Sequence, residues 1–380
     1  MAQSGLIRTA LYDNHLNAGA KMVDFHGFEL PIWYSSIQEE HLATRKLAGI
    51  FDVSHMGLFC FRGDEVRSWL SSVSTQEFNK FRPGSCGYTH FLDVNGYIID
   101  DMIFAISSED EVLGVPNSTM RERMLEWLEE NLPEDGSIAI EDRSDAVSII
   151  ALQGPESPSI VRGVMGELNT PGRFACQRIM ENVLGVKGWI QGTGYTGERG
   201  VEIFVEDEYA PLVWDAILSD SESRAVPVGL GARNTLRLEK GYLLSGQDFL
   251  WPGLGRKSYD LPEGFLARNT VETSVPYGLD LSHEFIGKEF VDASLEGGQR
   301  LRGLLCLDRG PSPRAGHEVF DGPGEEAGLL GHVTSGGPSP SLGMVGIALA
   351  YLDETKETEA WIQCSPKRRV RALLKSPPFV

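Results

Sequence analysis

The chain of 380 residues has little positive charge, with 34 Lys and Arg against 54 Asp and Glu and a formal net charge of −20 at pH 7. Phosphate contacts need clustered Lys and Arg, so this balance argues against a surface for DNA or RNA and against adhesion to anionic membranes. No run of 18 apolar residues is present, and the N-terminal segment lacks the apolar stretch of a secretory signal. We therefore expect a cytoplasmic protein that binds neither nucleic acid nor membrane.

Cysteine and metal-binding motifs are also scarce. The five cysteines are widely spaced without a Cys-x-x-Cys pair, and the eight histidines show no metal-ligand spacing. The sequence contains no Gly-x-Ser-x-Gly elbow and no P-loop lysine after a glycine run. These absences argue against a zinc cluster, a disulfide scaffold, a serine hydrolase and an NTPase, and we expect no metal.

Apolar periodicity predicts a mixture of helices and strands in the first two thirds of the chain. Helices are expected over 37–48, 120–132, 155–164, 209–218 and 230–240, and strands over 57–63, 86–107, 147–152, 187–191 and 201–205. Ser36 and Glu39 form a capping box for the first helix, and Gly49 is positioned to end it. Asn95-Gly96 predicts a hairpin with a type I′ turn.

The composition changes after Gly246. Residues 247–285 are rich in Pro, Gly, Asp and Ser, which is typical of a long functional loop or connector. Six short strands then follow with Gly and Pro between them, over 302–308, 317–320, 329–334, 343–351, 359–364 and 368–375. The pattern predicts a small all-β domain, either a barrel or a sandwich.

Two adjacent carboxylates, Asp100 and Asp101, interrupt an otherwise apolar strand. Side chains alternate along a strand, so one of the two faces the core. A buried carboxylate needs a partner, a raised pKa or a ligand. The alternatives are a structural Asp that accepts backbone N–H groups and an edge strand with one wet face.

The glycine-rich segment 192–200 (GTGYTGERG) contains a G-x-G-x-x-G match. A dinucleotide site requires a helix after this motif, but residues 201–205 alternate like a strand, so that interpretation fails. Glycines between two strands can instead let the backbone approach a flat ligand, and Glu198 can accept two adjacent donors. A charged hairpin tip is the simpler alternative.

Arg233 lies in the first turn of the helix predicted over 230–240. A cation there opposes the helix dipole, which suggests an anionic or polar partner. A salt bridge to a nearby Asp or Glu would serve equally well.

Taken together, these segments resemble the aminomethyltransferase (T-protein) family of the glycine cleavage system. The resemblance runs in order through 23–31 (VDFHGFELP), 48–57 (AGIFDVSHMG), 95–101 (NGYIIDD), 152–155 (LQGP), 193–198 (TGYTGE), 229–233 (GLGAR), 333–336 (VTSG) and 339–343 (SPSLG). It implies an α+β, multi-lobed folate-binding fold with a C-terminal all-β barrel domain. The implied domains are a folate-binding region 1–246, with intertwined lobes 1–55 plus 144–246 and 56–143, a connector 247–285 and a barrel 286–380.

The resemblance also implies an activity. The aminomethyl carbon passes from lipoylated H-protein to tetrahydrofolate, which gives 5,10-methylenetetrahydrofolate and releases ammonia. Asp100 matches the family's critical acid near the folate N10, Glu198 the pterin-binding Glu, and Arg233 a folate-contacting Arg. Pocket positions of the family are matched by Tyr88, Val115, Asn117 and Tyr195.

The chain departs from the family at two places. Ser245 stands where members usually carry a Tyr that lines the folate site, and residues 250–273 look longer than usual. These departures leave open a folate-dependent methyl- or demethyl-transferase that acts on a small sulfur or nitrogen compound. A folate-binding protein of iron–sulfur cluster assembly is disfavoured, because such relatives carry Lys-Gly-Cys where this chain has Lys-Gly-Tyr at 240–242.

Overall fold

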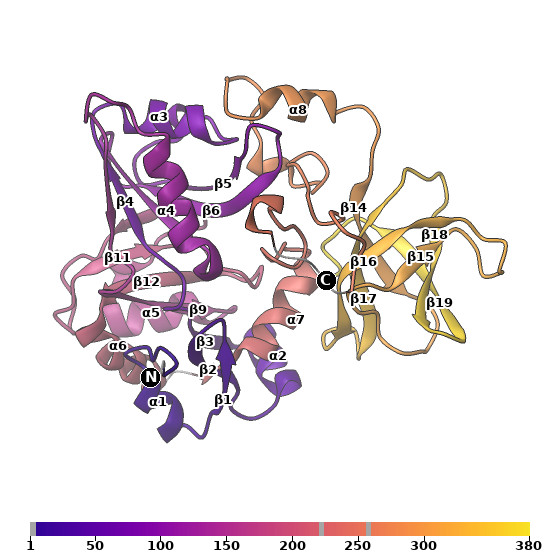
Figure 1. Ribbon diagram of the computed structural model, residues 1–380. Helices are drawn as coiled ribbons and strands as arrows, with labels where there is room; N and C mark the ends of the chain where they lie inside the picture. Colours follow the sequence, from indigo (N-terminus) through magenta and orange to yellow (C-terminus); the bar gives the residue numbers. More distant parts are fainter. Residues whose placement is uncertain (1–4, 220–223, 256–259) are drawn as a thin grey trace. The chain divides into compact units, whose positions relative to one another are not determined.

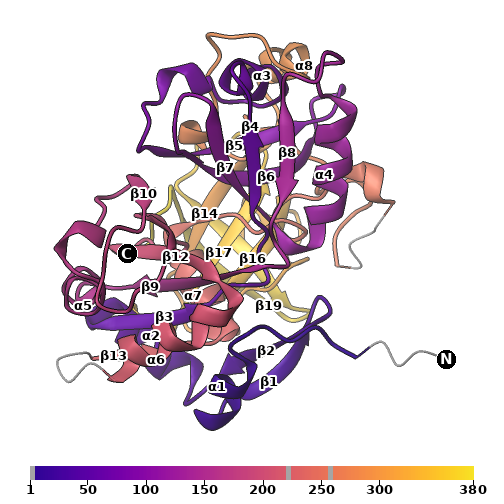
Figure 2. The same ribbon diagram turned by 90° about the vertical axis from the view of Figure 1, so that its left-hand side faces the viewer.

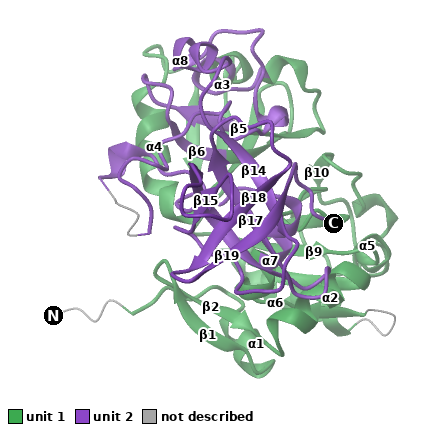
Figure 3. Ribbon diagram, turned by 90° about the vertical axis from the view of Figure 1, so that its right-hand side faces the viewer, with its two compact units in different colours: residues 1–70, 78–88, 102–234 green, residues 71–77, 89–101, 235–380 purple. Residues whose placement is uncertain are grey.

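A computed structural model describes residues 5–219, 224–255 and 260–380. The chain forms two compact units, each built from separate stretches of sequence (Figures 1 and 3). The first unit comprises residues 1–70, 78–88 and 102–234, and the second comprises 71–77, 89–101 and 235–380. The division cuts helices α3 (Val66–Val73) and α7 (Leu230–Lys240) and strands β5 (Cys86–Leu92) and β6 (Ile98–Ile106).

The N-terminal part of the first unit contains a short helix, a two-stranded sheet and a capped helix. These are α1 (Tyr12–Asn17), β1 (Lys21–Phe25) paired with β2 (Phe28–Trp33), and α2 (Ile37–Lys46). The Ser36 side chain accepts a hydrogen bond from the Glu39 N–H at 3.2 Å, which confirms the predicted N-cap. The predicted end at Gly49 is wrong, because Gly49 already lies in the next strand. A Cβ on Gly49 would collide with the Thr44 hydroxyl, so its lack of a side chain serves close packing.

A six-stranded sheet forms the centre of the first unit. Its strand order is β10-β11-β12-β9-β3-β13, with β3 and β13 parallel and the other neighbours antiparallel. The strands are β3 (Ala48–Asp52), β9 (Val147–Gln153), β10 (Cys176–Arg178), β11 (Gly188–Gln191), β12 (Gly200–Glu206) and β13 (Ala225–Pro227). Helices α5 (Ser157–Met165) and α6 (Ala210–Ser219) pack against it, as Figure 2 shows, and bury apolar residues of both layers in one core.

A five-stranded antiparallel sheet has the order β5-β6-β7-β4-β8. Its remaining strands are β4 (Phe59–Arg62), β7 (Glu111–Pro116) and β8 (Ala139–Asp142), and helix α4 (Arg121–Glu130) follows β7. Short 3-10 turns lie at η1 (Phe78–Lys80), η2 (Ser118–Met120), η3 (Glu167–Asn169) and η4 (Asp207–Tyr209).

The hairpin between β5 and β6 is present, but its predicted type I′ turn is wrong. Gly96 has a positive φ of 79°, whereas Asn95 does not belong to the residues with positive φ. The Asp93 carboxylate accepts the backbone N–H groups of Asn95 at 2.9 Å and Tyr97 at 3.0 Å. This Asx turn leaves only one left-handed position, at the glycine.

The connector expected at 247–285 contains two single-turn helices, η5 (Pro252–Leu254) and η6 (Pro276–Gly278). Residues 256–259 of this connector lie outside the described residues. Within the second unit the connector contacts the β5–β6 hairpin, where Trp251 Nε1 donates to Asp93 Oδ2 at 2.8 Å and the Ile98 N–H donates to the Arg268 carbonyl at 2.8 Å. Helix α8 (Lys288–Ala293) follows it.

The C-terminal region is a closed barrel with the strand order β14-β17-β16-β15-β18-β19, so the predicted all-β domain is confirmed (Figure 1). The strands are β14 (Arg300–Cys306), β15 (Glu318–Phe320), β16 (Leu329–Ser339), β17 (Val345–Leu352), β18 (Glu359–Ser365) and β19 (Arg368–Lys375). Alternate residues, among them Leu304, Ala350 and Ile362, fill its interior. The expected α+β architecture with a C-terminal barrel is therefore correct.

Among the described residues, no helix combines the length and apolar character needed to cross a membrane.

Candidate functional site

The glycine-rich loop between β11 and β12 is built around the buried amide of Gln153. The Gln153 Nε2 donates to the carbonyls of Thr193 at 3.0 Å and Val201 at 3.2 Å, and its Oε1 accepts from the Thr196 hydroxyl at 3.0 Å. A Cβ on Gly194 would overlap this amide, so that glycine is required by the protein's own packing. The glycine at position 194 is therefore explained by internal packing, without the predicted approach of a ligand.

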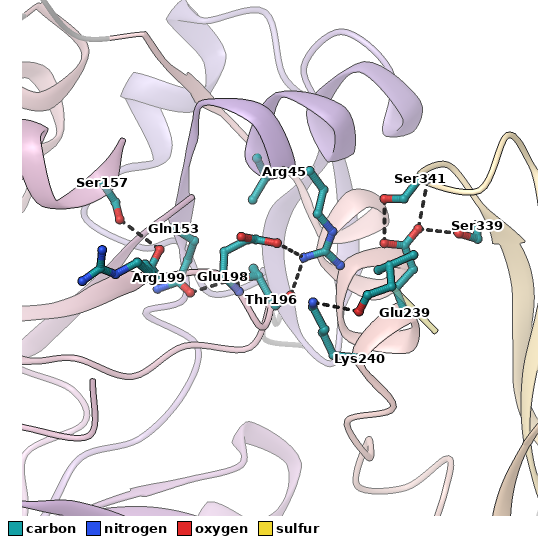
Figure 4. A network of polar contacts seen from close by, with 12 residues as sticks. Arg45, Gln153, Ser157, Thr196, Glu198, Arg199, Glu239, Lys240, Ser339 and Ser341 are labelled. Atoms are coloured by element: carbon teal, nitrogen blue, oxygen red, sulfur yellow. Dashed lines mark hydrogen bonds and ion pairs between the residues drawn. The ribbon is translucent and has the colours of Figure 1, made fainter. Parts of the chain in front are cut away.

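Glu198 follows Gly197, whose φ of 76° makes the sharp turn at the loop tip. Arg45 on α2 holds this carboxylate, with Nη1 donating to Glu198 Oε1 at 2.8 Å and to the Thr196 carbonyl at 2.6 Å (Figure 4). The side chains of Arg45 and Glu198 are only 10% and 21% exposed. Within the described part of the chain, no residue donates a hydrogen bond to Glu198 Oε2. Because Oε1 has a second lone pair beside the one that Arg45 uses, both oxygens of this oriented carboxylate can accept from a ligand.

Arg233 and Tyr195 form the second part of this group in the first unit. The guanidinium carbon of Arg233 lies 4.8 Å from the centre of the Tyr195 ring, a cation–π arrangement. Burial lowers the pKa of the Arg233 guanidinium, although the charges of Tyr195 and Glu202 act in the opposite direction and raise it. No carboxylate among the described residues forms an ion pair with Arg233, so the predicted alternative of a salt bridge is not observed there.

His55 lies near Arg233 at the end of the turn after β3. Its side chain packs edge-on against the rings of Phe25 and Phe28, and it is only 6% exposed. Burial, followed by the charge of Arg233, lowers the pKa of His55 to about 3, so this imidazole is neutral at physiological pH. Its Nδ1 has no hydrogen-bond partner within the described ranges.

The other predicted pocket residues of the first unit lie on or beside the five-stranded sheet. Val115 is half-buried on β7 and pairs with Ile103 of β6, while Asn117 precedes the turn η2. Tyr88 is half-buried on β5. Since the Gly57 N–H donates to the Pro116 carbonyl at 3.1 Å, the turn that carries His55 adjoins the segment of Val115 and Asn117.

Asp100 belongs to the second unit and is the inward member of the carboxylate pair. It is fully buried, whereas Asp101 is half-buried. The Ser245 hydroxyl donates to Asp100 Oδ1 at 2.7 Å. The buried acid therefore has a hydrogen-bond partner, as its burial led us to expect, and this partner lies 145 positions away in the sequence. Ser245, the position at which the sequence departs from the family it resembles, therefore bonds directly to the candidate catalytic acid.

A buried ion pair fixes the segment that carries Ser245. Arg237 Nη1 and Asp248 Oδ2 lie 2.8 Å apart with side chains that are 1% and 0% exposed. The same carboxylate accepts the hydroxyls of Thr334 and Ser335 on β16 and the N–H of Leu244. The turn 244–248 is thereby attached to both α7 and the barrel.

A second buried carboxylate attaches the end of α7 to the barrel. Glu239 is fully buried and accepts the hydroxyls of Ser339 at 2.6 Å and Ser341 at 2.8 Å (Figure 4). The serines of the segment SPSLG, noted above for its resemblance, thus hold a helix in place.

Arg45, Gln153 and His55 are among the residues of this description that were not singled out from the sequence. Arg45 carries no local signal beyond its place in the last turn of a helix. Gln153 and His55 lie inside the quoted segments LQGP and AGIFDVSHMG, which could have directed attention to them. Within the described ranges, no three His, Cys, Asp or Glu side chains are grouped closely enough to hold a metal ion.

Comparison with known proteins identifies the class to which this fold and these residues belong. Residues 11–250 match the family model described as "GCVT N-terminal domain", and residues 299–380 match "Glycine cleavage T-protein C-terminal barrel domain". The chain therefore belongs to the glycine cleavage T-protein family.

Relatives and a solved structure cover the chain from end to end. The aminomethyltransferase of Thermotoga petrophila is 35% identical over 378 residues, which cover 98% of this chain and 97% of that protein. The aminomethyltransferase of Thermus thermophilus is 36% identical over 375 residues, covering 98% and 99%. The crystal structure of glycine cleavage system aminomethyltransferase T from Bartonella henselae has a TM-score of 0.82 at 27% identity, covering 99% and 98%. This chain is accordingly an aminomethyltransferase of the glycine cleavage system, in a family that uses tetrahydrofolate as a substrate.

Proposed function

We propose that this chain takes the aminomethyl carbon from lipoylated H-protein and transfers it to tetrahydrofolate, giving 5,10-methylenetetrahydrofolate and ammonia. The observation that carries the proposal is the oriented Glu198 carboxylate, held by Arg45 on the loop that also carries Tyr195, whose ring packs against Arg233 of α7. This set combines a two-oxygen acceptor, an aromatic face and a cation, which suits a flat heterocycle with adjacent N–H donors.

Glu198 binds the pterin in this proposal. A pterin presents a 2-amino group beside N3–H, and a carboxylate accepts two such donors at once. Arg45 orients the carboxylate within the loop, since it bonds both Glu198 and the Thr196 carbonyl. Arg233 supplies a partly desolvated cation for a polar group of the folate.

Asp100 acts on the carbon that is transferred. That carbon becomes electron-poor during transfer, so an ionised carboxylate beside it stabilises the developing positive charge and orients the attacking nitrogen. The burial of Asp100 supports this role, because a charge interaction is stronger where water is excluded. Tyr88, Val115 and Asn117 are proposed as further contacts of the folate.

The test is ammonia release from aminomethylated, lipoylated H-protein, measured with and without tetrahydrofolate. Release that depends strongly on tetrahydrofolate is the expected result. If tetrahydrofolate binds but no ammonia is released, the donor is not H-protein, and a small sulfur or nitrogen compound takes its place. If tetrahydrofolate does not bind at all, the assigned roles of Glu198 and Arg233 are wrong.

A further inference from the structure

We propose that Ser245 is a positioning residue for the transfer reaction, which fixes the orientation of the Asp100 carboxylate and favours its ionised form. The inference rests on the proposed function, since it assigns Asp100 to the reacting carbon. The inference assigns a role in the reaction to Ser245, which acts through Asp100. The family that the sequence resembles usually has a Tyr at this position.

The geometry of the pair supports this role. The Ser245 hydroxyl has one proton to donate, and the distance of 2.7 Å to Asp100 Oδ1 is typical of a charge-assisted O–H···O bond. Asp100 is completely buried, so water cannot replace this bond without entering the protein. The hydroxyl therefore helps to hold the carboxylate in its observed orientation.

The backbone around Ser245 is held firmly enough to transmit that orientation. Ser245 forms a β-bridge with Phe249, and the Gly246 N–H donates to the Phe249 carbonyl at 2.8 Å. Asp248 accepts the Leu244 N–H at 2.9 Å while it is paired with Arg237. The serine is thus fixed by bonds on both sides of it in the chain.

Other titratable groups near Ser245 can also contribute to the pH dependence of the reaction. Asp101 adjoins Asp100 on β6. Burial, followed by the charges of Tyr242 and Asp101, raises the pKa of Tyr277. His90 on β5 packs edge-on against Phe249, and burial lowers the pKa of His90 to about 3. His90 therefore stays neutral above pH 5. A difference between Ser245 variants in the acid limb of the kcat profile then reflects protonation of carboxylates rather than of His90.

The experiment compares Ser245→Ala and Ser245→Thr with the wild-type chain in the ammonia-release assay. Loss of one hydrogen bond to a charged group predicts a fall in kcat of about tenfold for the Ala variant, with KM for tetrahydrofolate changed less than about twofold. Because the bond favours the ionised carboxylate, its loss moves the acid limb of the kcat profile to higher pH by about one unit. The Thr variant keeps the hydroxyl and retains both kcat and the acid limb.

Ser339→Ala is the matched control, because it also removes a serine that donates to a buried carboxylate, that of Glu239. It is expected to lower Tm while leaving the acid limb in place. If Ser245→Ala does not fold, Ser245→Cys keeps the side-chain size with a weak donor and is expected to show the same shift.

The inference is overturned if the Ala or Cys variant folds and keeps the wild-type kcat and acid limb, or if the Thr variant loses both. A failure of the proposed function gives a different result, since the wild-type chain itself would then release no ammonia.

Discussion

Glu198→Gln is the most direct test of how the first unit recognises its substrate. The substitution keeps the shape of the side chain and one oxygen, which can still accept from Arg45 and hold the loop. The second oxygen, which takes no hydrogen bond from any described residue, becomes an NH₂ group. A pterin edge with two donors would then meet one acceptor and one donor.

The magnitude follows from that mismatch. One charge-assisted hydrogen bond is lost, which corresponds to about 1.5–3 kcal/mol. In binding this is a weakening of Kd by about 10- to 150-fold. Because Arg45 is left with an amide oxygen and the Thr196 carbonyl, the fold is retained and Tm changes little.

Titration calorimetry with tetrahydrofolate, under anaerobic conditions, measures the change. The matched control is Glu206→Gln, which removes a carboxylate at the far end of β12, the strand that follows the loop of Glu198; the Glu206 side chain is 59% exposed and lies 3.9 Å from Arg143. The control is expected to bind like the wild-type chain. A Kd for Glu198→Gln within twofold of the wild type would refute the assigned role of this carboxylate.

Three further predictions follow from buried carboxylates. Asp100→Asn is expected to leave Tm nearly unchanged and to reduce ammonia release at least a hundredfold, since about 3 kcal/mol of charge stabilisation is lost; unchanged turnover would contradict its assignment. Asp248→Asn removes the carboxylate that pairs with the buried Arg237, so we expect a loss of about 3–5 kcal/mol in urea unfolding, against less than about 1 kcal/mol for an exposed pair. Burial would raise the pKa of Asp52, but the hydrogen bond and charge of His15 outweigh it and lower the pKa below the ordinary 3.8. The stability that Asp52 adds is therefore complete above about pH 4 and is lost as the pH falls through the lowered value, so Tm of the wild type and of Asp52→Asn should converge on acidification; a difference in Tm that grows as the pH falls would contradict this.

Local signals in the sequence predicted regular elements well. Ser36 starts α2 as expected, because its hydroxyl satisfies a backbone N–H that the helix leaves unpaired. The errors arose where a neighbour in space decides the conformation. Gly49 does not end the helix, since it is needed inside β3 against Thr44, and Asn95 avoids the left-handed region because Asp93 ties the turn.

The sequence proposed members of the candidate site but could not show how they are connected. Asp100 stood out because a carboxylate in an apolar strand requires an explanation, and Glu198 and Arg233 stood out by their segments. The sequence did not show that Arg45 would hold Glu198, nor that Gln153 would occupy the space beneath the glycine loop.

The sequence by itself determined the order of helices and strands, the barrel and the family, because periodicity, turn residues and ordered motifs are local properties of a chain. Only the tertiary structure decided which groups meet. Arg45 and Glu198 are 153 residues apart, and Ser245 and Asp100 are 145 apart, yet each pair forms a hydrogen bond below 3 Å. Such partners are selected by the packing of whole elements, which excludes water and leaves each buried polar group only the donors and acceptors that the fold brings within reach.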